Sequence, residues 1–243
     1  MILRPTPQGP IAIRQQDHAA FSAFLLEHWS DHGFPNDPER ERIIAAARRH
    51  DDGWIDVDDA PTLDPESGYP INFVSVGPEL AISIWRNGTR QALQRDPWEC
   101  LLVTHHAYSI NELAHKRDPE WKGFFTEFAR QRAELRSKLG LTHPDVERAY
   151  SYLRMVDWFS LRFCAATDLG QEKPETYGGY GFRSDGAEFQ FRPYPFDSPE
   201  LFYELPVCRL SPDGYARPED LRQALAQTDV LAIHISPLPR TRR

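Results

Sequence analysis

Apolar residues recur at helical spacing over most of the first 170 residues of the chain. Before the first helix, the runs MILR and IAIR at 1–4 and 11–14 are separated by a turn with proline and glycine, which predicts a β-hairpin. A helix follows, with Asp17 as its expected N-cap. One face of this helix carries His18, Phe21, Leu25 and Trp29, at steps of three and four residues.

Proline, aspartate and glycine mark the ends of the helices that follow. The words DPWE and DPEW, at 96–99 and 118–121, each place an aspartate cap before a proline at the first helical position. Gly140 is a typical helix stop. The pattern predicts helices over about 38–50, from 78 onward, from 97 through 113, from 121 to 139 and over about 144–166.

The stretch 53–77 interrupts this helical series. It is rich in glycine, proline and aspartate and has little regular pattern. A loop of this length is often functional, so we expect it to form a wall or a lid of a site.

Beyond residue 170 the pattern changes to the alternation typical of strands. The runs AEFQFRP at 187–193 and LFYELPVCRL at 201–210 predict strands, as does VLAIHI at 230–235. Between the last two, RPEDLRQALAQ at 217–227 predicts a short helix. The fold class is therefore α+β.

Two parts of unequal size follow from this change of pattern. Residues 1–170 form a mainly helical body with an N-terminal β-hairpin, and residues 171–243 form a small β-rich appendage. We expect the appendage to pack on the body together with the hairpin and not to fold independently. The side chains that it is expected to bury are Phe189, Phe191, Phe202 and Tyr203.

Composition limits the class of partner. The chain has 243 residues, and its 36 acidic against 28 basic residues give a formal net charge of −8. Nucleic acids and anionic membranes are held by clustered lysine and arginine, so neither is an expected partner. The N-terminal run lacks the apolar core of a secretory signal and no stretch is long enough to span a bilayer, so a cytoplasmic location is expected.

The cysteines add no chemistry to this picture. Cys100, Cys164 and Cys208 are far apart and lie in apolar surroundings. Neither a disulfide framework nor a thiolate zinc site is indicated, and we interpret the three as small buried hydrophobic residues.

Charged and imidazole groups occupy inward faces of three predicted helices. In the word RRHDDGW at 48–54, Asp51 and Asp52 follow a helix end, where each opposes the helix dipole by roughly 0.3–1 kcal/mol. Asp157 lies in the middle of an apolar stripe and requires a cationic partner. That partner is either an arginine, such as Arg154 or Arg162, or a divalent metal shared with histidines.

The second alternative has a precedent in a known superfamily. A lone histidine, an adjacent His and Asp at a helix end and a distant mid-helix Asp resemble the HD-domain metal-dependent phosphohydrolases over residues 15–168. The resemblance implies a helical HD-like bundle. It also implies metal ligation by His18, His50, Asp51 and Asp157. Trp54 stands where many members have a catalytic lysine, so the resemblance departs from the usual pattern there.

A closer resemblance concerns four short words. HDDGW, IWRNG, LLVTHH and VDWFSL, with the helical part preceding the β-rich part, are similar to a bacterial family of unknown function, DUF3891. This resemblance favours His106 over His105 as an additional metal ligand. It names no reaction.

The resulting hypothesis is a metal-dependent phosphohydrolase of HD type that acts on a small anionic phosphate ester. The ligands suit Mn, Fe, Co, Ni or Zn, and Asp52 is the expected proton acceptor. One alternative is a di-iron oxygenase of HD fold, which the pair His105 and His106 favours. Another is a non-catalytic module that binds a metal or ligand, which the missing lysine and the β-rich region favour.

Overall fold

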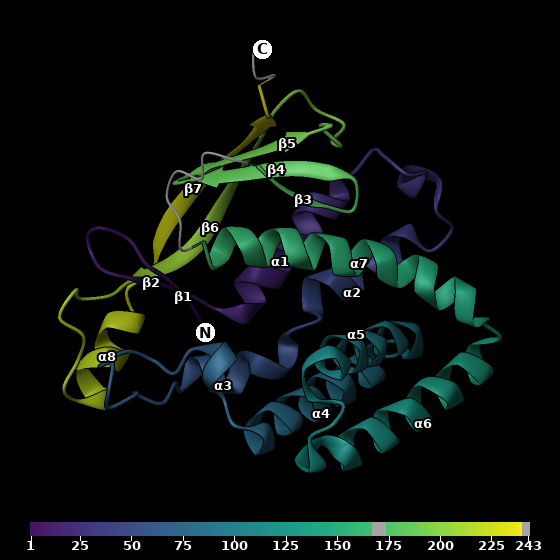
Figure 1. Ribbon diagram of the computed structural model, residues 1–243, viewed down its shortest axis with the longest axis horizontal. Helices are drawn as coiled ribbons and strands as arrows, with labels where there is room; N and C mark the ends of the chain where they lie inside the picture. The colour runs from purple at the N-terminus through teal and green to yellow at the C-terminus, as the bar shows by residue number, and fades with distance from the viewer. Residues whose placement is uncertain (167–173, 240–243) are drawn as a thin grey trace.

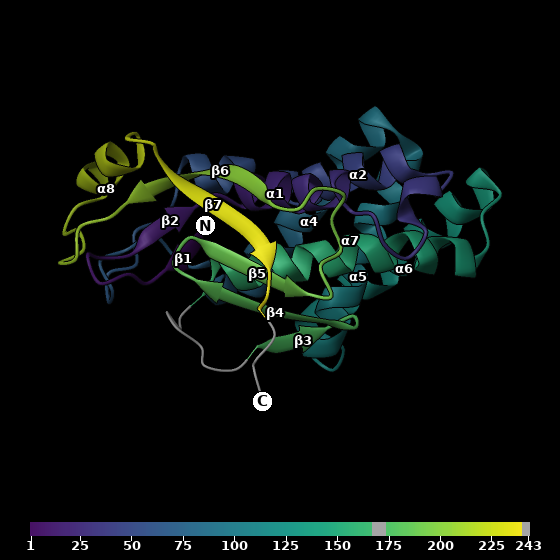
Figure 2. The same cartoon turned by 90° about the horizontal axis from the view of Figure 1, so that it is seen from above.

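The structure is a computed structural model that describes residues 1–166 and 174–239, and it confirms the α+β class. A seven-stranded sheet lies on one side of the molecule, and helices α1 and α7 lie against it (Figure 1). Helices α4, α5 and α6 lie on the side of α1 and α7 that is away from the sheet. Figure 2 shows the sheet from above, with the short helix α8 at one end.

The helices agree closely with the sequence pattern. Their bounds are α1 Gln15–Glu27, α2 Arg40–Arg49, α3 Ile55–Asp59, α4 Pro78–Arg95, α5 Pro97–His115, α6 Lys122–Leu139, α7 His143–Cys164 and α8 Pro218–Leu225. The predicted cap Asp96 accepts a hydrogen bond from the Trp98 amide at 2.9 Å, and Gly140, with φ of 67°, ends α6 in the left-handed conformation that glycine tolerates. Local signals therefore set where these helices start and stop.

The strands come from both ends of the chain. Their bounds are β1 Ile2–Arg4, β2 Ile11–Ile13, β3 Glu175–Tyr177, β4 Tyr180–Asp185, β5 Glu188–Arg192, β6 Leu201–Arg209 and β7 Asp229–Pro237, in the order β1-β2-β6-β7-β5-β4-β3. The predicted hairpin of β1 and β2 is confirmed, and β2 continues into the C-terminal strands by pairing with β6. All neighbours are antiparallel except β5 and β7, which are parallel.

One hydrophobic core joins the helices to the sheet. From α7, Phe159 and Phe163 contact the β5 rings Phe191 and Phe189, with ring centroids 5.1 and 5.2 Å apart. The main core cluster includes residues from both sides of position 170. The predicted boundary at 170 itself lies outside the described residues.

Some local predictions were wrong. Asp17 does not cap α1, which begins after Arg14 without a side-chain cap, and Asp118 makes no side-chain cap for the helical turn that follows it. Phe202 is 67% exposed, because adjacent strand residues point to opposite faces and the buried face of β6 belongs to Leu201 and Leu205. The stretch 53–77 contains the short helix α3, and β3 and β4 were not predicted.

The three cysteines are buried and free, as expected. Among the described residues, no helix combines the length and the apolarity required to cross a lipid bilayer.

Candidate metal centre

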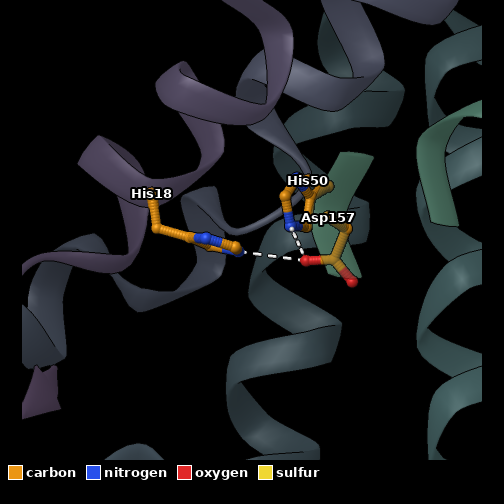
Figure 3. Close-up of side chains that lie close together, drawn as sticks. All are labelled: His18, His50 and Asp157. Atoms are coloured by element: carbon orange, nitrogen blue, oxygen red, sulfur yellow. Dashed lines mark hydrogen bonds and ion pairs between the residues drawn. The ribbon is translucent and has the colours of Figure 1, made fainter. Parts of the chain in front are cut away.

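Five side chains converge from four helical segments: α1, the end of α2, α5 and α7. The group, called here the histidine–aspartate cluster, consists of His18, His50, Asp51, His106 and Asp157. His18 Nε2 and His50 Nε2 lie 3.0 and 3.1 Å from the same Asp157 atom, Oδ1. Figure 3 shows both imidazole rings directed at that carboxylate from α1 and from the end of α2. The ligand atoms of these three residues all lie within 4.8 Å of one another, so they could hold a metal ion.

Asp51 and His106 complete the cluster at slightly longer range. Asp51 Oδ2 lies 3.4 Å from His50 Nε2 and 3.8 Å from His18 Nε2. His106 Nε2 lies 3.9 Å from Asp157 Oδ2, and its ring packs edge-on against that of His50. The five residues predicted as ligands are thus brought together.

Two glycines position the histidine–aspartate doublet of residues 50 and 51. A Cβ on Gly53 would lie 2.2 Å from the Ile84 carbonyl oxygen, and one on Gly88 would lie 3.2 Å from the Gly53 nitrogen. The chain after α2 therefore crosses α4 backbone against backbone, and at position 53 only glycine allows so close an approach. This contact explains why the words HDDGW and IWRNG both contain glycine.

The histidine tautomers follow from the hydrogen bonds on the far side of each ring. His50 Nδ1 lies 2.7 Å from the Ala47 carbonyl oxygen. A carbonyl only accepts, so His50 Nδ1 carries a proton and, in the neutral ring, Nε2 presents a lone pair to Asp157.

His18 is held in a similar way by two serines. His18 Nδ1 lies 2.6 Å from Ser160 Oγ, which lies 2.6 Å from Ser22 Oγ, and Ser22 donates to the His18 carbonyl oxygen at 3.2 Å. Ser160 Oγ also lies 3.3 Å from the Asp157 carbonyl oxygen. One arrangement compatible with these contacts places the proton on His18 Nδ1, and in the neutral ring His18 Nε2 then presents a lone pair to Asp157, as His50 Nε2 does.

Two lone pairs directed at one carboxylate oxygen repel one another unless a cation lies among them. A proton meets this need in part: burial opposes the charge on His50, but Asp51 and Asp157 outweigh burial and raise its pKa to about 9. Burial also opposes the charge on Asp157, yet hydrogen bonds from His18 and His50 hold its pKa well below the usual range. A divalent metal would meet the same need by replacing that proton.

A proton on His50 leaves His106 without a hydrogen-bond partner. Burial, with the charges of His50 and His18, lowers its pKa to about 3, so its ring is neutral. Its Nδ1 is buried without a hydrogen-bond partner, and its Nε2 is too far from Asp157 for a hydrogen bond. Imidazole nitrogens with carboxylate oxygens suit borderline divalent metals, so the residues present fit the expected ion.

Asp52 and Trp54 lie outside this convergence. The Asp52 carboxylate pairs with Arg95 at 3.0 Å, and Trp54 is buried by packing. Burial raises the pKa of Asp52, which the charges of Arg95 and Arg49 oppose. The expected role of Asp52 as a proton acceptor stays a prediction.

The sequence left two choices open: whether His105 or His106 joins the ligands, and whether Asp157 pairs with an arginine or with histidines. Contacts between distant parts of the chain decide both. His105 faces Glu147, at 3.0 Å, and not the cluster. Arg162 pairs with Glu175. Among the described residues, Asp157 forms no ion pair with an arginine within 4.0 Å; its partners are histidines.

Sequence reasoning missed the two serines. Ser22 follows His18 by four residues and Ser160 follows Asp157 by three, so each lies one turn from a predicted ligand on a largely apolar helix face. That spacing was the signal that could have found them, since helical residues three or four apart are neighbours.

Comparisons with known proteins concern the family only. A family model described as "Protein of unknown function (DUF3891)" matches residues 1–212. No curated protein and no solved structure matches the chain.

Proposed function

Because the chain belongs to DUF3891, whose description assigns no activity, we propose from its site that it is a metal-dependent phosphohydrolase of HD type. Its substrate in this proposal is a small phosphate ester. His18, His50, Asp51, His106 and Asp157 are the proposed metal ligands. The resemblance of their order along the chain to the HD pattern supports the reaction class.

One observation carries the proposal. The Nε2 atoms of His18 and His50 converge on Asp157 Oδ1 at 3.0 and 3.1 Å, while the two Nδ1 atoms have hydrogen-bond partners of their own, Ser160 Oγ and the Ala47 carbonyl oxygen. Hydrogen bonds that fix the remote nitrogen of a ligating histidine are typical of metal sites, because they set the tautomer and orient the ring.

The exposure of the cluster favours a small substrate. The side chains of His18 and His50 are each 1% exposed, whereas that of Asp157 is 15% exposed. Access is therefore narrow and lies on the Asp157 side.

The chain's residues would divide the chemistry between them. A divalent metal in the cluster would supply Lewis acidity, which can lower the pKa of water from about 15.7 to about 7. The buried histidines orient the site and exclude bulk water. Asp52, next to the doublet, is the proposed proton acceptor, and Arg95 holds its carboxylate in position.

The position of His105 bears on the di-iron alternative. That alternative drew support from the pair His105 and His106, but only His106 lies in the cluster. We therefore retain hydrolysis as the proposed reaction.

The test measures metal content and turnover together. Full-length protein is purified, loaded separately with Mn, Fe, Co, Ni or Zn, and assayed against a panel of phosphate esters. We expect one bound metal per chain and activity that is lost in His50→Ala and Asp51→Ala, with Arg130→Gln on the outer face of α6 as a control. Asp52→Asn should retain metal and lose turnover.

Other outcomes are equally informative. Two irons per chain would favour the oxygenase. If chelators do not change the stability of the protein and no ester is hydrolysed, the non-catalytic module is favoured and the proposal is abandoned.

A further inference from the structure

One face of α7 continues from the metal centre toward the surface. Tyr150, Arg154 and Asp157 follow one another at steps of four and three residues, so they lie on one side of the helix on consecutive turns. Asp157 is the most exposed of the side chains that converge on His18 and His50. Tyr150 and Arg154 therefore lie on the same side of α7 as Asp157.

Tyr150 is a buried hydroxyl without a partner. The residue is 2% exposed, and its phenolic oxygen has no hydrogen bond. The Ser109 hydroxyl on α5 lies near it but outside hydrogen-bond geometry. Buried hydroxyls are normally hydrogen-bonded, and the poorly aligned Ser109 hydroxyl leaves this one able to donate to an acceptor of better geometry.

The ring of Tyr150 is fixed beside the cluster. Its centroid lies 4.7 Å from that of His105 and 5.9 Å from that of His106. His106 in turn faces Asp157. The Tyr150 ring therefore lies against His106, which is one of the proposed metal ligands.

Arg154 supplies positive charge next to the Tyr150 ring. It is exposed, and its guanidinium carbon lies 5.6 Å from the centre of the Tyr150 ring. In the part of the chain that the structure describes, no carboxylate lies within 4.0 Å of it, although the chain as a whole carries a net charge of −8. A guanidinium matches phosphate geometry with two parallel hydrogen bonds.

From these observations we infer that Tyr150 and Arg154 bind the non-bridging oxygens of a phosphate monoester at the metal centre. This inference rests on the proposed function and narrows its substrate class. A monoester has three non-bridging oxygens and a diester has two. A metal, a bidentate arginine and a tyrosine hydroxyl together are therefore better matched by the monoester.

The test uses inorganic phosphate as a probe of the full chain loaded with manganese. Phosphate affinity is measured by calorimetry at fixed ionic strength for wild type, Arg154→Gln and Tyr150→Phe, and manganese content is measured separately on each. Arg130→Gln is the matched control, because Arg130 is exposed and pairs only within α6, with Glu134.

Loss of a hydrogen bond to a charged group should weaken phosphate binding about tenfold or more in Arg154→Gln, and by several-fold in Tyr150→Phe. Manganese content and the control should not change. In turnover assays, both variants should lose more activity with p-nitrophenyl phosphate than with bis(p-nitrophenyl) phosphate.

The outcomes separate this inference from the proposed function. If both variants retain manganese and bind phosphate as wild type does, the inference is overturned and the metal centre stands. If wild type binds phosphate through Arg154 but takes up no metal, the anion site stands and the hydrolase proposal fails. A chain that binds neither overturns both.

Discussion

Four consecutive residues, 49–52, contribute to two neighbouring polar clusters, and the carboxylate charges of the two clusters are balanced in different ways. His50 and Asp51 belong to the histidine–aspartate cluster. Arg49 and Asp52, on either side of them, belong with Arg95 and Glu99 to what we call the arginine–acid cluster. Both clusters contain two carboxylates, but only the second contains permanent cations.

The arginine–acid cluster is complete without help. Glu99 accepts two hydrogen bonds from Arg49, at 2.9 and 3.2 Å, and two from Arg95, at 2.6 and 2.9 Å. Two arginines balance two acids whenever both acids are ionised, since guanidinium stays charged. The histidine–aspartate cluster has imidazoles in their place, so it depends on a proton or a metal. This difference teaches that Arg49 and Asp52, on either side of the doublet, lie in a cluster that needs no added cation, whereas His50 and Asp51 lie in one that does.

The largest expected effect comes from removing a charge from the histidine–aspartate cluster. Asp157→Asn keeps the shape of the side chain but removes the charge on which both histidines converge. We expect metal affinity to fall at least about 100-fold, more than the loss of an outer contact causes. Metal content after dialysis and a competitive titration measure it.

Glu99→Gln is the matched control for that experiment, because it removes one carboxylate charge from the neighbouring cluster. Metal content should be retained. Equal loss of metal in the two variants would contradict the division into two clusters.

The next effect is that of chelation on stability. A metal present at about 100 times its dissociation constant stabilises the folded protein by about 2.7 kcal/mol. Treatment with EDTA should therefore lower the melting temperature of wild type but not that of Asp157→Asn. Differential scanning fluorimetry of both proteins, with and without chelator, decides this, and an identical response of the two would argue against a bound metal.

Glu99→Gln should instead lower stability by a metal-independent amount. Arg49 and Arg95 lose a charged acceptor, and hydrogen bonds to charged groups contribute about 1.5–3 kcal/mol each in buried settings. Because both arginines are about one-third exposed, water compensates in part, and we expect a loss of about 1–2 kcal/mol. Urea unfolding should give the same loss of stability with and without EDTA. A loss that disappears on chelation would show that Glu99 acts through the metal centre and would contradict the division into two clusters.

The smallest effect tests the serines behind His18. Ser160→Ala removes the hydroxyl that lies 2.6 Å from His18 Nδ1 but none of the proposed ligands. Metal affinity should fall about tenfold, the lower end of the range for such supporting contacts. Ser151→Ala, on the exposed face of α7, is the control. A Ser160→Ala protein with wild-type affinity would show that packing alone orients His18.

Much of the fold was predictable because its signals are local. The cap at Asp96, the stop at Gly140 and the period of three and four residues through α7 each act within a few residues of the chain. A polar partner for Asp157 was also predictable, since a buried carboxylate on an apolar stripe demands one wherever it folds. The choice of His18, His50, Asp51 and His106 as that partner set came from the family resemblances.

The sequence by itself therefore determined the order of the elements and the residue types that must meet. Only the tertiary structure decided that His106 and not His105 joins the cluster and that Asp52 turns to Arg95. It also decided that Phe202 faces solvent. Each of these choices depends on which neighbour covers a given face. That depends on the packing of segments far apart in the chain, such as α5 against α7 and β6 against β7, and no local pattern encodes it.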